Sequence, residues 1–115
     1  MISISYVELT VTDLAEAKRF YTAAFGWKFN DYGPGYAGIQ SPDGSSEVGG
    51  LAAGAAVAPG GPLVLLEAED LAAARSAIEA AGGAAHELID YPGGQRFEFT
   101  DPSGNRLGVF RSAHS

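Results

Sequence analysis

The stretch VELTVTDLAEAKRFYTAAFG, residues 7–26, recurs as VLLEAEDLAAARSAIEAAGG, residues 64–83. At a constant offset of 57 residues, nine of the 20 aligned positions are identical, among them Asp13/Asp70 and Leu14/Leu71. Two pairs of turn sequences follow in the same order: YGPG at 32–35 with YPGG at 91–94, and SPDG at 41–44 with DPSG at 101–104. This order predicts an internal duplication, and two copies are too few for a solenoid.

Each copy has the pattern of a strand, a helix and three further strands. Residues 3–11 alternate in polarity, as a strand with one polar face does. Asp13 is placed to cap the first helix, with Glu16 three residues on, and Gly26 supplies the left-handed residue that ends it. The expected helices are 13–26 and 71–81, and the expected strands are 3–11, 27–31, 36–40, 47–52, 63–68, 84–90, 96–100 and 106–111.

The chain is expected to form a single α+β domain over residues 1–115. Its tandem βαβββ modules cover about 3–52 and about 63–111, and the linker at about 53–62 consists almost entirely of Ala, Gly and Pro. A linker this short does not isolate two domains, so we expect both halves to share one sheet. The tail, residues 112–115, is expected to fray.

Composition excludes several classes of protein. Hydrophobic residues make up 46% of the chain and charged residues 18%, which predicts a folded domain rather than a disordered segment. A net charge of −7 disfavours nucleic acid as a partner. No apolar run reaches the length of a membrane helix, and we expect a soluble cytoplasmic protein with no membrane partner. Because the chain lacks Cys and has only His86 and His114, sulfur-ligated zinc and three-histidine sites are excluded within one chain.

Three segments carry a resemblance to a known family. VTDL opens the first helix, RFY and FGW stand near its end, and FEFTDPSGNRL spans residues 97–107. With the tandem modules, these segments make the chain resemble the vicinal oxygen chelate superfamily, which includes glyoxalase I, extradiol dioxygenases, fosfomycin-resistance transferases and bleomycin-binding proteins. The resemblance implies a curved mixed sheet from both modules around a concave cavity, with the helices outside. It specifies the fold better than the reaction.

The same resemblance predicts where a metal would bind. Members that use a divalent metal place His or Glu at four strand positions facing the cavity. Those positions correspond here to Tyr6, Leu63 and Gly108, with Glu47 the only candidate in the strand at 47–51. Three of the four are not plausible ligands, so we expect no metal and no other cofactor.

Carboxylates offer a second chemistry. By alternation, Glu8 and Glu67 share the cavity-facing register with Tyr6, Thr10 and Leu65, and the direction of Glu98 is left open. If Glu8 is enclosed, desolvation is expected to raise its pKa and make it a candidate general base. Arg106, in the same register, would lower that pKa. The alternative is that each Glu is simply solvated near the open end of its strand.

Aromatic residues offer a third chemistry, the stacking of a planar ligand. Tyr6, Trp27, Tyr32, Tyr36 and Phe110 are candidates for a flat apolar slot that stacks a planar ligand. Core packing is the alternative for Trp27, which directly follows the helix end. Tyr6 is the strongest candidate, because it replaces a metal ligand while pointing inward, and its hydroxyl can bond a carbonyl or act as an acid.

Three functions are consistent with these residues. The first is metal-free binding of a small organic metabolite or antibiotic, aromatic compounds included. The second is a metal-independent isomerase, cyclase or lyase with Glu8, Glu67 or Tyr6 as catalytic groups, and the third is a metal-dependent lyase or dioxygenase with an unusual site. Whether the protein is an enzyme is left open, and a homodimer is expected. The candidate ligand-binding residues are Tyr6, Glu8, Thr10, Trp27, Tyr36, Leu65, Glu67, Arg106 and Phe110.

Overall fold

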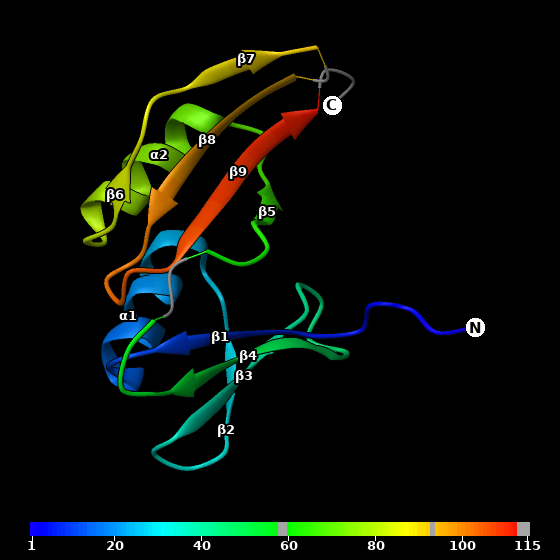
Figure 1. Ribbon diagram of the computed structural model, residues 1–115, viewed down its shortest axis with the longest axis vertical. Coiled ribbons are helices and arrows are strands. Elements are labelled where there is room, and N and C mark those ends of the chain that lie inside the picture. The colour runs from blue at the N-terminus through cyan, green and yellow to red at the C-terminus, as the bar shows by residue number, and fades with distance from the viewer. Residues whose placement is uncertain (58–59, 93, 113–115) are drawn as a thin grey trace.

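The computed structural model describes residues 1–57, 60–92 and 94–112 and contains two modules in tandem, of which the first is βαβββ and the second has one strand more after its helix (Figure 1). Both the α+β class and the order of the elements within the modules are confirmed. The first module consists of β1 (Val7–Val11), α1 (Leu14–Phe25), β2 (Phe29–Asp31), β3 (Tyr36–Gln40) and β4 (Glu47–Ala53). The second consists of β5 (Val64–Glu67), α2 (Leu71–Ala80), β6 (Ala84–Ala85), β7 (Ile89–Tyr91), β8 (Gly94–Thr100) and β9 (Arg106–Ser112).

Each module forms its own curved sheet, which we call sheet A and sheet B. Sheet A has the order β1-β4-β3-β2, and sheet B has the order β5-β9-β8-β6 with β7 also paired to β8. In both, the first strand runs parallel to the last, and the other pairs are antiparallel. The expectation of one shared sheet is wrong for the described residues, where β1 and β5 are edge strands of separate sheets (Figure 1).

The helix ends follow the sequence signals. Asp13 caps α1 by accepting a hydrogen bond from the backbone N–H of Glu16 at 3.0 Å, and Asp70 does the same for Ala73 in α2. Gly26 ends α1 with a left-handed φ of 73°, a conformation that costs glycine nothing. In α2 the cap is Ala81 in right-handed geometry, so the left-handed residue comes one position later, at Gly82.

The region predicted as one strand at 84–90 is two strands, β6 and β7. Ala85 pairs with Phe99 and Ile89 pairs with Arg96, so three residues on this side face two on β8. The extra residue interrupts the ladder as a bulge does. At this interruption the Arg75 guanidinium donates a hydrogen bond to the His86 carbonyl at 3.0 Å.

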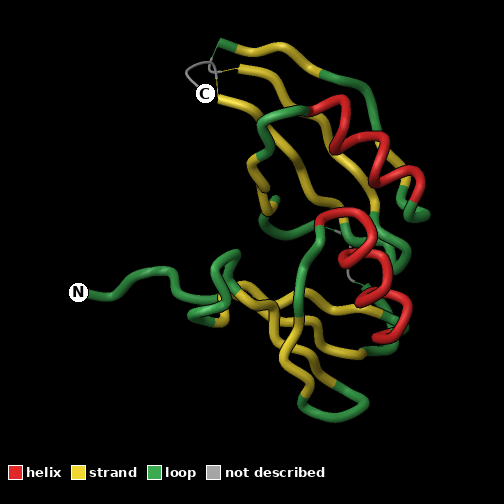
Figure 2. Tube along the Cα trace, turned by 180° about the vertical axis from the view of Figure 1, so that it is seen from behind, coloured by secondary structure: helices red, strands yellow, loops and turns green. Residues whose placement is uncertain are grey.

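The two modules share one core, which lies between the sheets. It joins Val11, Ile39 and Leu51 of sheet A to the buried aromatic and aliphatic residues of β8 and β9. The helices lie one above the other on this side of the sheets and pack against each other (Figure 2). The other face of each sheet points away from the common core. The expected architecture of tandem modules that form a curved mixed sheet with two helices is thus confirmed, with two sheets in the described chain in place of one.

The DPSGN stretch connects the modules. Asp101 is 4% exposed, and its carboxylate accepts hydrogen bonds from the backbone N–H groups of Ser103 and Asn105 and from the Tyr21 hydroxyl of α1, the last at 2.8 Å. The Asn105 amide donates to the Thr10 carbonyl of β1 at 2.7 Å. The burial of Tyr21 and the neighbouring carboxylate raise the pKa of its phenol above the ordinary value.

We predict that Tyr21→Phe lowers the free energy of unfolding by about 1–3 kcal/mol, because it leaves a buried carboxylate short of one hydrogen bond. Urea denaturation measures this change. The control is Tyr32→Phe, which removes the same atom from a side chain that is 61% exposed and is expected to change stability by less than about 0.5 kcal/mol. Equal effects of the two substitutions would contradict a special role for the Asp101 bond.

Candidate functional site

The outer face of sheet A, opposite the core, carries the polar candidates of the first module. Glu8 and Thr10 of β1 lie on this face, while Val7 and Leu9, which alternate with them along the strand, point to the other side. Glu8 is in register with Gly50 of β4, and Gly50 with Gly38 of β3. Tyr6 precedes β1 and continues the same alternation.

Five side chains on this face form a hydrogen-bonded group around one carboxylate, here called the Glu47 cluster. Glu47 Oε2 accepts from the Tyr6 hydroxyl at 2.8 Å, and Oε1 accepts from the Tyr32 hydroxyl at 2.7 Å and the Asn30 amide at 3.0 Å. The Tyr36 hydroxyl lies 2.9 Å from that of Tyr6. Since the Tyr6 proton is directed at Glu47, Tyr36 donates to Tyr6 in this arrangement.

Two glycines make room for the cluster. A Cβ on Gly50 would lie 2.0 Å from Tyr36 Oη, and one on Gly38 would lie 2.0 Å from Glu47 Oε1. No real contact is that short, so the phenol and the carboxylate rest directly on the backbone of β3 and β4. Because Gly38 and Gly50 have no side chain, the cluster can lie close to the backbone of the sheet.

The hydrogen bonds shift the acidity of the cluster in opposite directions. Donation by Asn30, Tyr32 and Tyr6 lowers the pKa of Glu47, so it is ionised at neutral pH. Withdrawal of the Tyr6 hydroxyl from water, with its bonds to Tyr36 and Glu47, raises the pKa of that phenol. The bond to Glu47 likewise raises the pKa of Tyr32. Tyr6 is therefore a poor acid, and its proton is already engaged.

The candidates of the second module lie on the outer face of sheet B, away from the Glu47 cluster. Leu65 covers Gly108, and Glu67 and Phe110 are paired across β5 and β9. Arg106 Nε lies 2.5 Å from Glu98 Oε1, and Arg96 lies 3.9 Å from the same carboxylate. Arg106 thus pairs with Glu98, not with Glu8. Glu8 and Glu67 are both exposed, and the enclosure that a general base would need is absent from their surroundings in the described chain.

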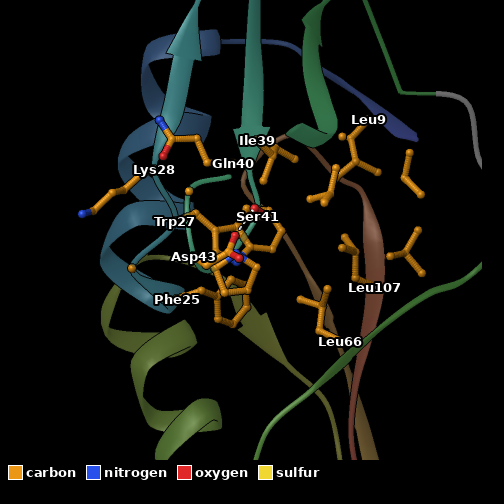
Figure 3. Close-up of a pocket in the computed structure, with 17 residues that line it drawn as sticks. Leu9, Phe25, Trp27, Lys28, Ile39, Gln40, Ser41, Asp43, Leu66 and Leu107 are labelled. Atoms are coloured by element: carbon orange, nitrogen blue, oxygen red, sulfur yellow. Dashed lines mark hydrogen bonds between the residues drawn. The ribbon is translucent and has the colours of Figure 1, made fainter. Parts of the chain in front are cut away.

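Trp27 lies on the core side of sheet A and stacks on Tyr21, with centroids 4.7 Å apart and planes at 9°. It lines a pocket of about 600 Å³ between the sheets, with Trp27 and Phe25 on one side and Leu9, Leu66 and Leu107 on the other (Figure 3). Trp27 is therefore separated from Tyr6 and Tyr36 by the sheet. The expected aromatic slot is only partly assembled, by Tyr6, Tyr32 and Tyr36.

The residues present do not fit the metal site of the resembled family. Glu47 is the single carboxylate in the cluster, and its oxygens are engaged by phenols and an amide. Within residues 1–57, 60–92 and 94–112, no three His, Cys, Asp or Glu side chains are close enough to share an ion. His86 is bonded to Thr100, and His114 lies outside the described residues.

Sequence reasoning placed Tyr6, Tyr32 and Tyr36 as candidates but did not group them around Glu47, and it missed Asn30. The grouping depends on the β-bulge after Ile39, which brings Gln40 opposite Glu47. The only signal in the sequence was the pair of tyrosines flanking the turn at 32–36. Nothing in the spacing reveals which side chains meet across three strands.

The chain belongs to the Glyoxalase/Bleomycin resistance protein/Dioxygenase superfamily, whose family model matches residues 3–109. The fold is similar to that of a glyoxalase-related enzyme from Fulvimarina pelagi, with 21% identity, coverage of 97% of this chain and 89% of that one, and a TM-score of 0.80. It is also similar to TnmS3, an antibiotic binding protein from Streptomyces sp. CB03234, with 24% identity, 98% coverage of both chains and a TM-score of 0.72.

A glyoxylase/bleomycin resistance protein/dioxygenase domain from Frankia sp. EAN1pec is 23% identical and covers 100% of this chain and 95% of its own, with a TM-score of 0.77. At these identities the likeness shows the fold. A search of curated proteins finds no match. In the described residues, neither helix is long and apolar enough to span a bilayer.

We predict that Glu47→Gln lowers the pKa of Tyr6 and Tyr32 toward that of free tyrosine, because it removes the negative charge that both phenols face. Ultraviolet absorbance during alkaline titration measures phenolate formation, with circular dichroism to identify the range in which the protein stays folded. Glu79→Gln on α2 removes an equal charge outside the cluster and serves as the control. A tyrosine titration that is the same in both variants would contradict the geometry of the cluster.

Proposed function

We propose that the protein binds a small organic ligand on the outer face of sheet A, over the Glu47 cluster. The observation that supports this most directly is the convergence of two phenols and an amide on one carboxylate at an open face, with a third phenol bonded to the first and glycine backbone beneath them. A few precisely placed, convergent polar groups are what fixes the orientation of a ligand in a binding site. Maintaining such a group on an otherwise solvated sheet has no evident packing role, since the core lies on the opposite side.

Binding is better supported than catalysis. A general base works best with a pKa near the operating pH, and the pKa of Glu47 is lowered away from that range. Glu8 and Glu67 are exposed and are not enclosed by the neighbouring strands. The carboxylate isomerase, cyclase or lyase hypothesis thus has weaker support than a binding site.

We propose that the site has no resident metal, since Tyr6 stands where the resembled family places a ligand and Glu47 is the single carboxylate of the cluster. We predict that elemental analysis after exposure to nickel, zinc, manganese or ferrous iron and exhaustive dialysis finds no stoichiometric ion. Retention of one ion per chain, lost in Glu47→Gln, would replace this proposal with the metal-dependent alternative.

Ligand binding is tested by recording ¹H–¹⁵N spectra of the labelled protein during titration with a fragment collection of aromatic amines, acids and neutral compounds. We predict saturable shifts at the amides of Gly38 and Gly50, which lie directly under the cluster. Saturable shifts confined to Gly26 and Trp27 would instead assign binding to the pocket between the sheets. The absence of any saturable shift at Gly38 and Gly50 would contradict the proposed site.

We further propose that the protein forms a homodimer in which a second copy packs against the edge strands β1 and β5. The edge strands β1 and β5 leave backbone groups unpaired, and Val7 and Leu65 are exposed along them. The N-terminal segment extends away from β1 (Figure 1), and its apolar residues Met1, Ile2 and Ile4 are exposed. A homodimer would cover these apolar groups.

Equilibrium sedimentation tests the dimer. We predict a species of twice 11.8 kDa at micromolar concentration that dissociates in the Leu65→Asp variant, because a charge at an apolar interface is costly to desolvate. Leu88→Asp, at an exposed site in the loop before β7, is expected to leave the mass unchanged. A mass of 11.8 kDa for the unaltered protein would exclude the dimer.

A further inference from the structure

We propose that the ligand of the Glu47 cluster is an organic cation, a protonated amine carried on an apolar or aromatic body. This inference rests on the proposed function, because it names the chemical class that the same site would select. Three independent features of the described residues support it: the hydrogen-bond inventory of the cluster, the charges of sheet A, and the arrangement of the rings.

The hydrogen bonds of the cluster leave acceptors for a ligand. The hydroxyl protons of Tyr6 and Tyr32 are donated to Glu47, and that of Tyr36 is donated to Tyr6. The Asn30 amide also donates to Glu47, and its oxygen accepts from Gln40 at 3.0 Å. Apart from the second N–H of the Asn30 amide, what the cluster still offers is lone pairs on phenol and carboxylate oxygens. A ligand that bonds to it must therefore supply the donors.

The charge around the cluster is negative and is not balanced from within the sheet. The strands of sheet A contain Glu8, Asp31 and Glu47 but neither Lys nor Arg. Lys18 and Arg19 project from α1, where they pair with Asp31 and Glu16, respectively. Lys28 lines the pocket on the core side (Figure 3). No side-chain cation of the first module, residues 1–57, thus contacts Glu47 in the described chain.

The outer face of sheet B shows the contrasting case. There Glu98 lies between Arg96 and Arg106, so its charge is already compensated within the protein. On the outer face of sheet A, by contrast, the ionised Glu47 is bonded to two phenols and an amide, which are neutral groups. A positive ligand group would stand where the arginines stand on sheet B.

The aromatic rings favour an ammonium ion over a hydrated metal ion. Tyr32 and Tyr36 have ring centroids 6.2 Å apart with planes at 50°, and both hydroxyl groups belong to the cluster. Ring faces attract ammonium groups, and the attraction is greater when these are partly desolvated. A hard metal ion is usually held by several carboxylate and carbonyl oxygens, and Glu47 is the single carboxylate in the cluster. The combination of rings and one carboxylate is therefore suited to an amine with an apolar body.

The test uses three probes with the same aromatic body: 1-naphthylmethylammonium, 1-naphthalenemethanol and 1-naphthaleneacetate. Their affinities are measured at pH 7 and low salt from the shifts of the Gly38 and Gly50 amides. We expect the ammonium probe to bind about tenfold or more tightly than the carboxylate probe, as one close charge pair near a protein surface allows. The neutral probe is expected to fall between them.

Variants separate this inference from the proposed function. Glu47→Gln should weaken the ammonium probe by about tenfold while leaving the neutral probe within about twofold, and Glu79→Gln should leave both unchanged. Equal affinities for all three probes, or tighter binding of the carboxylate, would overturn the cation inference but leave the binding site in place. If none of the three probes shifts Gly38 or Gly50, the proposed function itself fails.

Discussion

The position of the two modules relative to each other depends on the buried carboxylate of Asp101. It fixes the DPSGN turn through the backbone N–H groups of Ser103 and Asn105 and holds α1 of the other module through Tyr21. Asn105 extends the connection to the Thr10 carbonyl of β1. A buried carboxylate is tolerated only when its oxygens are bonded, and here the bonds come from both halves of the chain. Among the described residues no strand pairing joins the two sheets, so this polar connection and the common core fix the position of each sheet relative to the other.

That arrangement decides which surfaces are open for function. Because both helices and both apolar sheet faces are used in the core, the polar faces of sheets A and B point away from it. The related strands then carry different chemistry on the two faces. Sheet B compensates Glu98 with arginines, whereas sheet A surrounds Glu47 with phenols and an amide. The duplicated fold thus provides one neutral face and one acidic face.

The acidic face fits a binding role within a superfamily whose members share a fold and differ in activity. The glycines of β3 and β4 let the phenol and carboxylate lie flat on the backbone, and the hydrogen bonds inside the cluster hold them in place. Such preorganisation lowers the entropic cost of binding a ligand. The apolar pocket near Trp27 lies on the other side of the same sheet, so the two regions are separate surfaces.

The sequence alone determined the duplication, the helix ends at Asp13, Gly26 and Asp70, and the strand at 36–40, because caps, turns and periodicity are local signals. Together with the family resemblance, it predicted that Tyr6 and Gly108 stand where metal-binding members place ligands. Only the tertiary structure decided that the modules form two sheets, that Trp27 faces the core and that Arg106 pairs with Glu98. It alone brought Tyr6, Asn30 and Tyr32 to Glu47, because strand register and a bulge, which are set by packing between distant segments, decide which side chains meet.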